Sequence, residues 1–200
     1  MTDRQFFWGL SNGAVMFTLA GFFWFGIAMS AIPRAQPLFV LLVGAFVLLL
    51  LGVTRLRRKA RGFRYAELAL AGERQRHENR RIQLGIRWAV IAQTVLIGGG
   101  VYGFVSVGRQ DLIWAWIGLI VSLHFLPLGR VFQVPAYYVT GLAGAAASLA
   151  ALAGLIGSPP LAILGLTMGA IMWSTTIYLL QGAERIVARG IEAIEKVSTT

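Results

Sequence analysis

The sequence predicts an all-α polytopic membrane protein with six transmembrane helices and with its N-terminus and C-terminus in the cytoplasm. Three observations support this prediction. Of the 200 residues, 57% are hydrophobic and only 13% are charged, whereas roughly 25% of the residues of a soluble domain are charged. Six apolar stretches approach the roughly 20 residues that a helix needs to cross the hydrocarbon core. Most of the basic residues fall on one side of these stretches.

The six spans are expected at residues 6–30, 37–54, 88–107, 112–129, 135–156 and 160–180. Three of the connections carry residues that end helices. Pro33 and Pro37 follow the first span, "VGRQD" follows the third, and "GSPP" follows the fifth. Because these connections are short, the helices that they join are expected to pack antiparallel.

Two segments outside the spans are expected to be helical. Residues 55–87 are a basic cytoplasmic segment that we expect to continue as one helix into the third span from about Gly72, because Ala, Leu, Glu, Gln and Arg are good helix formers. Residues 181–200 place Val187, Ile191 and Ile194 on one face. This pattern is typical of an amphipathic tail that lies on the membrane surface or against the 55–87 segment. The whole chain is therefore expected to be one membrane domain.

The distribution of basic residues predicts the orientation. Sixteen Arg and Lys residues lie on the side that holds both chain ends, eleven of them within residues 55–87, and only Arg34 and Arg109 lie on the other side. Because cytoplasmic loops are enriched in Lys and Arg, both termini are expected in the cytoplasm. The excess of Arg over Lys is typical of a GC-rich bacterial genome, so we expect a bacterial inner membrane.

The basic run "RLRRKARGFR" (55–64) directly follows the second span. It is predicted to contact anionic lipid head groups or a protein partner at the cytoplasmic face through Arg55, Arg57, Arg58, Lys59 and Arg61. The simpler interpretation is that the run only determines the topology. Nucleic-acid binding is not expected, because no recognition fold accompanies the run.

Several kinds of active site lack their residues in this sequence. Cysteine is absent, which excludes disulfides, thiolate metal sites and cysteine nucleophiles. None of the eight acidic residues falls inside a predicted span, and the two histidines, His77 and His124, lie at very different depths. We therefore expect no metal and no cofactor. A membrane enzyme is the least favoured interpretation, with Ser11 or Ser174 as its nucleophile.

Glycine and other small residues recur in the third, fifth and sixth spans. The stretch "TVLIGGGVYGF" (94–104) shares Val, Tyr and Gly with potassium-channel filters, but its position in the middle of a span favours close helix packing instead. Small residues also repeat four apart, in the pairs Gly141/Ala145, Gly144/Ser148, Ala147/Ala151, Ala150/Gly154 and Gly165/Gly169. These faces predict tight packing within the chain or in a homo-oligomer.

His124 is the one ionisable side chain that the sequence places inside a span. Pro127 follows it by three residues and is expected to kink the helix, because proline removes a backbone hydrogen bond. Polar residues occur at the same expected depth on four other spans: Asn12, Gln93, Tyr138 and Thr175. They either line a pocket open to the cytoplasm, with His124 titrating or holding a ligand, or only fix the register of the helices.

The sequence "HFLPLGRVF" (124–132), followed by "YY" (137–138), resembles segments of small uncharacterised bacterial multi-pass membrane proteins that carry a His-Phe-Leu-Pro helix motif. The resemblance covers the fourth and fifth spans and implies no assigned activity.

Two functions are therefore expected from the sequence. The first is transport or binding of a small polar solute or a proton through the pocket around His124. The alternative is a non-catalytic structural or regulatory membrane subunit that engages lipid or a protein partner.

Overall fold

The structure, a computed structural model, describes residues 3–59 and 73–198, and the side chains of residues 10–58 and 84–185. Its elements are helices α1 (Asp3–Ser30), α2 (Gln36–Lys59), α4 (Glu73–Ser106), α5 (Ile113–Phe132), α6 (Pro135–Leu152) and α7 (Pro160–Ser198), with a 3₁₀ turn, η1 (Gln110–Leu112). All six α-helices are long and apolar enough to cross a membrane. The expectation of six helices of this length and hydropathy is thus confirmed.

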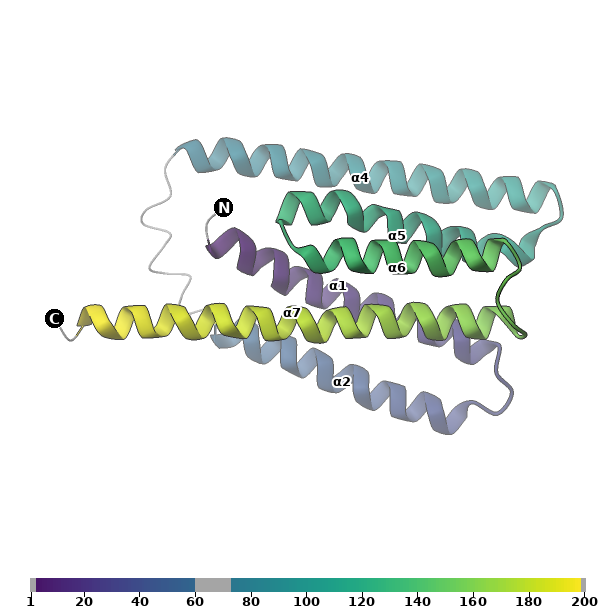
Figure 1. Cartoon of the computed structure of the whole chain (residues 1–200), viewed down its shortest axis with the longest axis horizontal. Coiled ribbons are helices and arrows are strands. Elements are labelled where there is room, and N and C mark those ends of the chain that lie inside the picture. The colour runs from purple at the N-terminus through teal and green to yellow at the C-terminus, as the bar shows by residue number, and fades with distance from the viewer. Residues whose placement is uncertain (1–2, 60–72, 199–200) are drawn as a thin grey trace.

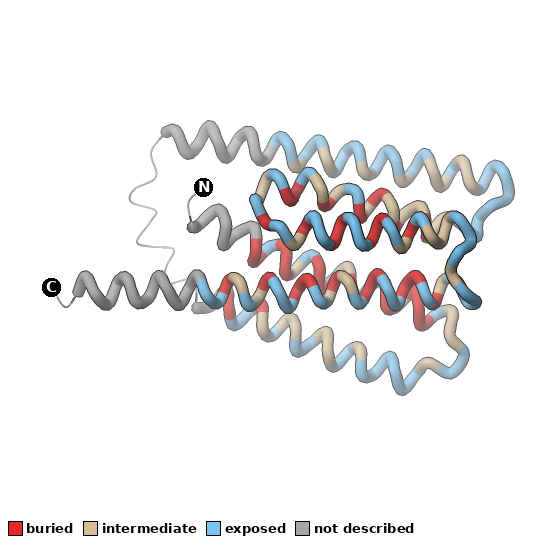
Figure 2. Tube along the Cα trace, viewed as in Figure 1, coloured by how far each residue is buried: buried red, intermediate tan, exposed pale blue. Residues whose placement is uncertain are grey.

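Helices α4 and α2 lie at opposite edges of the bundle, with α1, α5, α6 and α7 between them (Figure 1). Helix α1 packs along α7, and α5 packs along α6. Helix α2 lies against α1 and α7, whereas α4 lies against α5. The burial differs accordingly (Figure 2): 56% of the α1 span and 44% of the α7 span are buried, compared with 6% for α2 and none for α4. The core is therefore made mainly by α1, α5, α6 and α7, and α2 contributes Val53 and Leu56 to it.

Glycines allow α1 and α7 to approach each other closely. A Cβ atom added to Gly165 would lie 2.7 Å from the backbone oxygen of Trp24, and one added to Gly169 would lie 2.8 Å from the ring of Phe25. One turn farther along, the Trp173 ring covers Gly21 of α1. Without a hydrophobic force between helices in lipid, this close backbone contact is what holds transmembrane helices together.

Helices α5 and α6 use small residues in the same way. Ser122 packs on Gly144, and Ser148 packs on Gly118, as expected for antiparallel neighbours. The turn between the two helices is tight, because Gln133 adopts a positive φ of 53° and Pro135 begins α6. The predicted small residues Gly141, Gly144, Gly165 and Gly169 are therefore in contact within the chain, whereas Gly154 faces open space beyond the end of α6.

Helix α4 begins at Glu73 and runs into the span without a break, as expected from the sequence. Two helix ends differ from the expected ones. Helix α6 ends at Leu152 rather than near 156, because Gly154 has a φ of +69° and the Leu155 N–H bonds to the Ala150 carbonyl. Residues 181–198 continue α7 as one helix instead of forming a separate tail. The starts of α1 and α4 and the ends of α2 and α7 all lie at one end of the bundle (Figure 1).

Candidate functional site

The five residues predicted to line one pocket lie at different helix contacts. Asn12 is bonded to α2, His124 and Gln93 lie between α5 and α4, and Thr175 is bonded to α6. Tyr138 is 39% exposed and its ring covers Gly129 of α5. The structure thus brings His124 and Gln93 to the same interface and distributes the other three over separate ones.

His124 faces α4. Its imidazole is half-buried and interacts with the backbone of Ala89. Gln93, also half-buried, lies one turn beyond Ala89 on α4, and residues four apart share a helix face. Pro127 lies exposed inside α5, which continues to Phe132. The kink expected at Pro127 stays a prediction.

Trp116 of α5 attaches the C-terminal half of α4. The indole N–H of Trp116 donates to the backbone carbonyl of Leu96 at 3.0 Å. Its ring lies over Gly100, where a Cβ atom would overlap the indole. The absence of a side chain at Gly100 therefore lets the tryptophan reach the backbone of α4.

Thr175 takes part in one of two threonine pairs in the core. Its hydroxyl lies 2.6 Å from that of Thr140 on α6, and the Thr18 hydroxyl donates to Thr176 at 3.4 Å. Thr175 also donates to the carbonyl of Ile171, four residues earlier in its own helix. Because each hydroxyl has partners inside the protein, these pairs act as interhelical hydrogen bonds.

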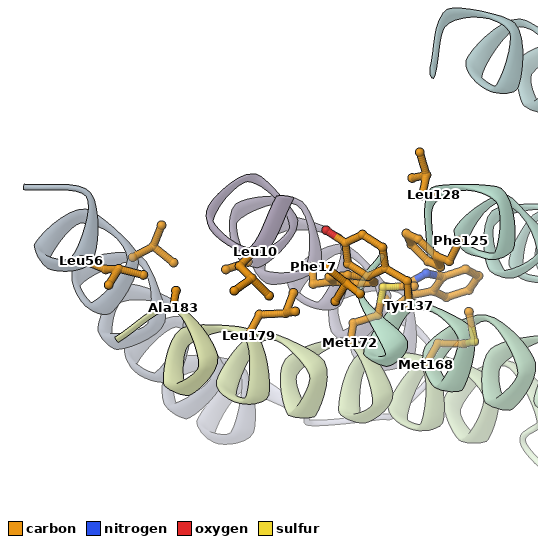
Figure 3. Close-up of a cluster of buried hydrophobic side chains, with 14 of the residues drawn as sticks. Leu10, Phe17, Leu56, Phe125, Leu128, Tyr137, Met168, Met172, Leu179 and Ala183 are labelled. Atoms are coloured by element: carbon orange, nitrogen blue, oxygen red, sulfur yellow. The ribbon is translucent and has the colours of Figure 1, made fainter. Parts of the chain in front are cut away.

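Tyr137, rather than Tyr138, is the buried tyrosine of α6. It is 3% exposed and packs against Phe17 and Phe125 (Figure 3). Its ring also contacts Phe132. The sequence does contain a signal that could have identified it. Tyr137, Thr140, Gly141, Gly144, Ala145 and Ser148 are spaced three or four apart along one face, and all are buried.

Arg57 forms a contact that was not foreseen from the sequence. Its Nε–H donates to Ser11 Oγ at 3.0 Å, and its Nη2 donates to Asn12 Oδ1 at 2.7 Å. Ser11 is completely buried, Arg57 is half-buried and Asn12 is exposed. The arginine and the asparagine had been assigned to different sites, the basic run and the pocket. The structure joins them.

The other members of the basic run lie around Arg57 or outside the described part of the chain. Arg55 and Arg58 are exposed on α2, the side chain of Lys59 is not described, and Arg61 lies outside the described residues. We define the basic end of the bundle as Arg55, Arg57, Arg58, Arg87, Arg130 and Arg185. At the opposite end, the described cations are Arg34 and Arg109, and Arg109 is paired with Asp111 at 3.2 Å.

The fold and these contacts define an all-helical chain with six helices able to span a membrane and with basic side chains gathered at one end. Within the described residues, no three His, Asp or Glu side chains are grouped so that they could hold a metal ion. Comparison of the chain with protein-family models, curated proteins and solved structures finds no match.

Proposed function

We propose that this chain is a non-catalytic structural or regulatory subunit of a bacterial inner membrane, and that its basic end engages anionic lipid head groups. Both termini then lie in the cytoplasm, following the positive-inside rule. The observation that carries the proposal is the position of Arg57, which is held by α1 at the point where the apolar run of α2 ends.

The level of the basic end in the membrane supports lipid as the partner. Thr54 is followed by Arg55, Arg57 and Arg58 on α2, so these cations begin where the hydrocarbon core ends. Each basic residue near an anionic membrane surface contributes about 1 kcal/mol of attraction. The exposed guanidinium groups of Arg55 and Arg58 are therefore well placed for lipid phosphates, and a protein partner would use the same surface.

The contacts inside the bundle also favour a structural role. Within each of the pairs Thr18/Thr176 and Thr140/Thr175, the two hydroxyl groups are hydrogen-bond partners. Self-association stays a prediction. Small residues of α6 and α7 that predicted it pack within the chain instead, as Gly144 and Gly165 do.

Thermal unfolding in lipid nanodiscs tests the proposal. Wild-type protein should be more stable in phosphatidylcholine mixed with phosphatidylglycerol than in phosphatidylcholine alone, because a ligand that binds the folded state stabilises it. The Arg55→Gln, Arg58→Gln double variant should lose part of this difference, and so should wild type at high salt. Equal unfolding temperatures of wild type in the two lipids would contradict the proposal.

A second function, transport or binding of a small polar solute or a proton, is favoured by one observation. His124 and Gln93 are half-buried at the same α4/α5 contact, and an ionisable residue inside a membrane is a candidate site. In proteoliposomes, His124→Ala should abolish proton-linked flux while leaving the unfolding temperature nearly unchanged. Unchanged flux would remove His124 from that role.

A further inference from the structure

We infer that Arg57, positioned by Ser11 and Asn12, forms a binding site for a single phosphate group, which we assign to the head group of an anionic phospholipid. This inference rests on the proposed function and makes it specific. A diffuse basic surface attracts many lipids weakly, whereas one preorganised guanidinium group binds one phosphate in a defined geometry.

Among the described residues, the hydrogen-bond partners of Arg57 occupy one edge of its guanidinium group and not the other. Nε and Nη2 use the side of the group that faces α1, bonding Ser11 at 3.0 Å and Asn12 at 2.7 Å. A guanidinium group carries five N–H donors in a fixed planar arrangement. The second N–H of Nη2 and one N–H of Nη1 therefore form the end-on edge of the group, which matches two oxygens of a phosphate.

The side chain is held in place before any ligand arrives. Val53 and Leu56, on the same turn of α2, are 1% and 2% exposed, so the backbone next to Arg57 is anchored in the bundle. Ser11 is fixed by the packing of α1 along α7. Ordering a flexible side chain opposes binding by roughly 0.5–1.5 kcal/mol. The contacts to α1 remove much of this cost for Arg57.

Within the described part of the chain, the hydrogen-bond partners of Arg57 are neutral. Ser11 and Asn12 contribute no charge, and among the described residues no carboxylate lies within 4.0 Å of the guanidinium group. Arginine stays protonated at all physiological pH values. A half-buried cation at the edge of the hydrocarbon core is stabilised by an anion, and lipid phosphates are the anions present at that depth.

The neighbouring cations provide an internal comparison. Arg55 and Arg58 are exposed on the same helix and form no hydrogen bond with the described residues. They add positive potential but lack the fixed orientation of Arg57. The inference therefore predicts that Arg57 differs from Arg58 in lipid binding, although the two arginines are adjacent and have the same charge.

Native mass spectrometry with titrated phosphatidylglycerol tests this difference, using Arg57→Lys with Arg58→Lys as the matched control. Both variants keep the charge, but lysine cannot form the bidentate contact. Wild type and Arg58→Lys should each retain one phosphatidylglycerol molecule per chain with similar affinity. Arg57→Lys should bind it about tenfold more weakly. Asn12→Ala, an exposed change that removes one positioning contact, should weaken retention by a smaller factor.

Equal retention by Arg57→Lys and Arg58→Lys would overturn the inference. If phosphatidylglycerol still stabilised wild type over phosphatidylcholine in the nanodisc measurement, the proposed function would stand without this site. If wild type retained phosphatidylglycerol no better than phosphatidylcholine, both the inference about Arg57 and the proposed function would be rejected. Competition with inorganic phosphate distinguishes a lipid head group from free phosphate as the ligand. Lipid that millimolar phosphate cannot displace supports the head-group assignment. Displacement of the lipid would assign the site to free phosphate and overturn the head-group assignment.

Discussion

The two edge helices of this bundle are much less buried than the four central helices, although their mean hydropathy is similar or higher. Helix α2 is the most apolar span and is 6% buried, whereas α6 is the least apolar span and is 39% buried. In a soluble protein this order would be reversed. Lipid is as apolar as leucine, so apolar side chains such as Leu41 and Leu48 of α2 gain nothing by turning inward. Both are about as exposed as side chains on a protein surface, at 71% and 70%.

Small residues distinguish the centre from the edges. In the α1/α7 and α5/α6 pairs, glycines meet backbone or side-chain atoms of the partner helix, as Gly165 and Gly144 do. In α4, Gly98 and Gly99 meet nothing within 4 Å. The comparison teaches that close backbone approach, rather than hydropathy, determines which helices of this chain form the core.

The largest effect on stability is expected at Gly165, in the close contact between α1 and α7. A methyl group there would lie 2.7 Å from the Trp24 oxygen and 2.9 Å from the Ala28 nitrogen. Because these are backbone atoms, α1 and α7 would have to separate. Gly165→Ala should lower stability by about 2–3 kcal/mol, measured as a drop in the unfolding temperature in detergent.

The matched control for this change is Gly98→Ala in α4, where the added methyl group meets open space. It should leave the unfolding temperature unchanged or raise it slightly, since alanine favours the helix. If both variants unfolded at the same temperature, small residues would not be what distinguishes the centre from the edges.

A smaller effect is expected at the contact that attaches α4. Trp116→Phe removes the N–H that donates to the Leu96 carbonyl, a hydrogen bond that contributes about 1 kcal/mol. Hydrogen exchange should accelerate in α4 near Leu96 and stay unchanged in α7. Trp88→Phe, at a tryptophan that is 67% exposed, is the control, and a uniform acceleration in both helices would show that α4 belongs to the core.

The Thr140/Thr175 pair between α6 and α7 should contribute less to stability than the Trp116 hydrogen bond. A double-mutant cycle with Thr140→Val and Thr175→Val should give a coupling of about 0.6 kcal/mol, as for other hydrogen bonds between membrane helices. The coupling stays small because each hydroxyl keeps its own helix carbonyl as a partner when the other is removed. Thr94→Val, on the exposed face of α4, should show no coupling to either. A coupling of zero would mean that the 2.6 Å contact between the two hydroxyls does not contribute to stability.

The smallest effect is expected outside the packed centre, at the turn between α4 and α5. The Arg109–Asp111 ion pair is exposed on both sides, and exposed pairs are screened by water and salt. Asp111→Asn should therefore leave the unfolding temperature unchanged at both low and physiological salt. A clear decrease in the unfolding temperature would mean that this turn unfolds cooperatively with the helix bundle.

The six spans could be predicted because a bilayer requires about 20 apolar residues in each helix, and this sequence shows them plainly. Side-chain neighbours were harder to predict. Depth along a helix follows from counting residues, but the face that a residue presents depends on where its neighbours lie. Asn12 and Thr175 were predicted to lie at the same depth and to line one pocket. In the structure, Asn12 contacts Arg57 of α2 and Thr175 contacts Thr140 of α6.

Arg57 could not be singled out for a related reason. The sequence shows a run of equivalent cations, and only the packing of α2 on α1 brings one of them to Ser11 and Asn12. For Tyr137 the information was available, since it shares a buried face with Thr140 and Gly144. Periodicity within α6 could have chosen it over Tyr138.

The most direct test of the central claim, that lipid covers α2 and α4 while α1, α5, α6 and α7 form the core, is the oxygen accessibility of single spin labels. The chain has no cysteine, so one can be introduced at Leu48 of α2, Val95 of α4 and Met168 of α7, which are 70%, 67% and 0% exposed. The account predicts high accessibility to oxygen dissolved in lipid at Leu48 and Val95, and low accessibility at Met168. Low accessibility at Leu48 and Val95 as well would contradict it, because these faces would then be covered by protein.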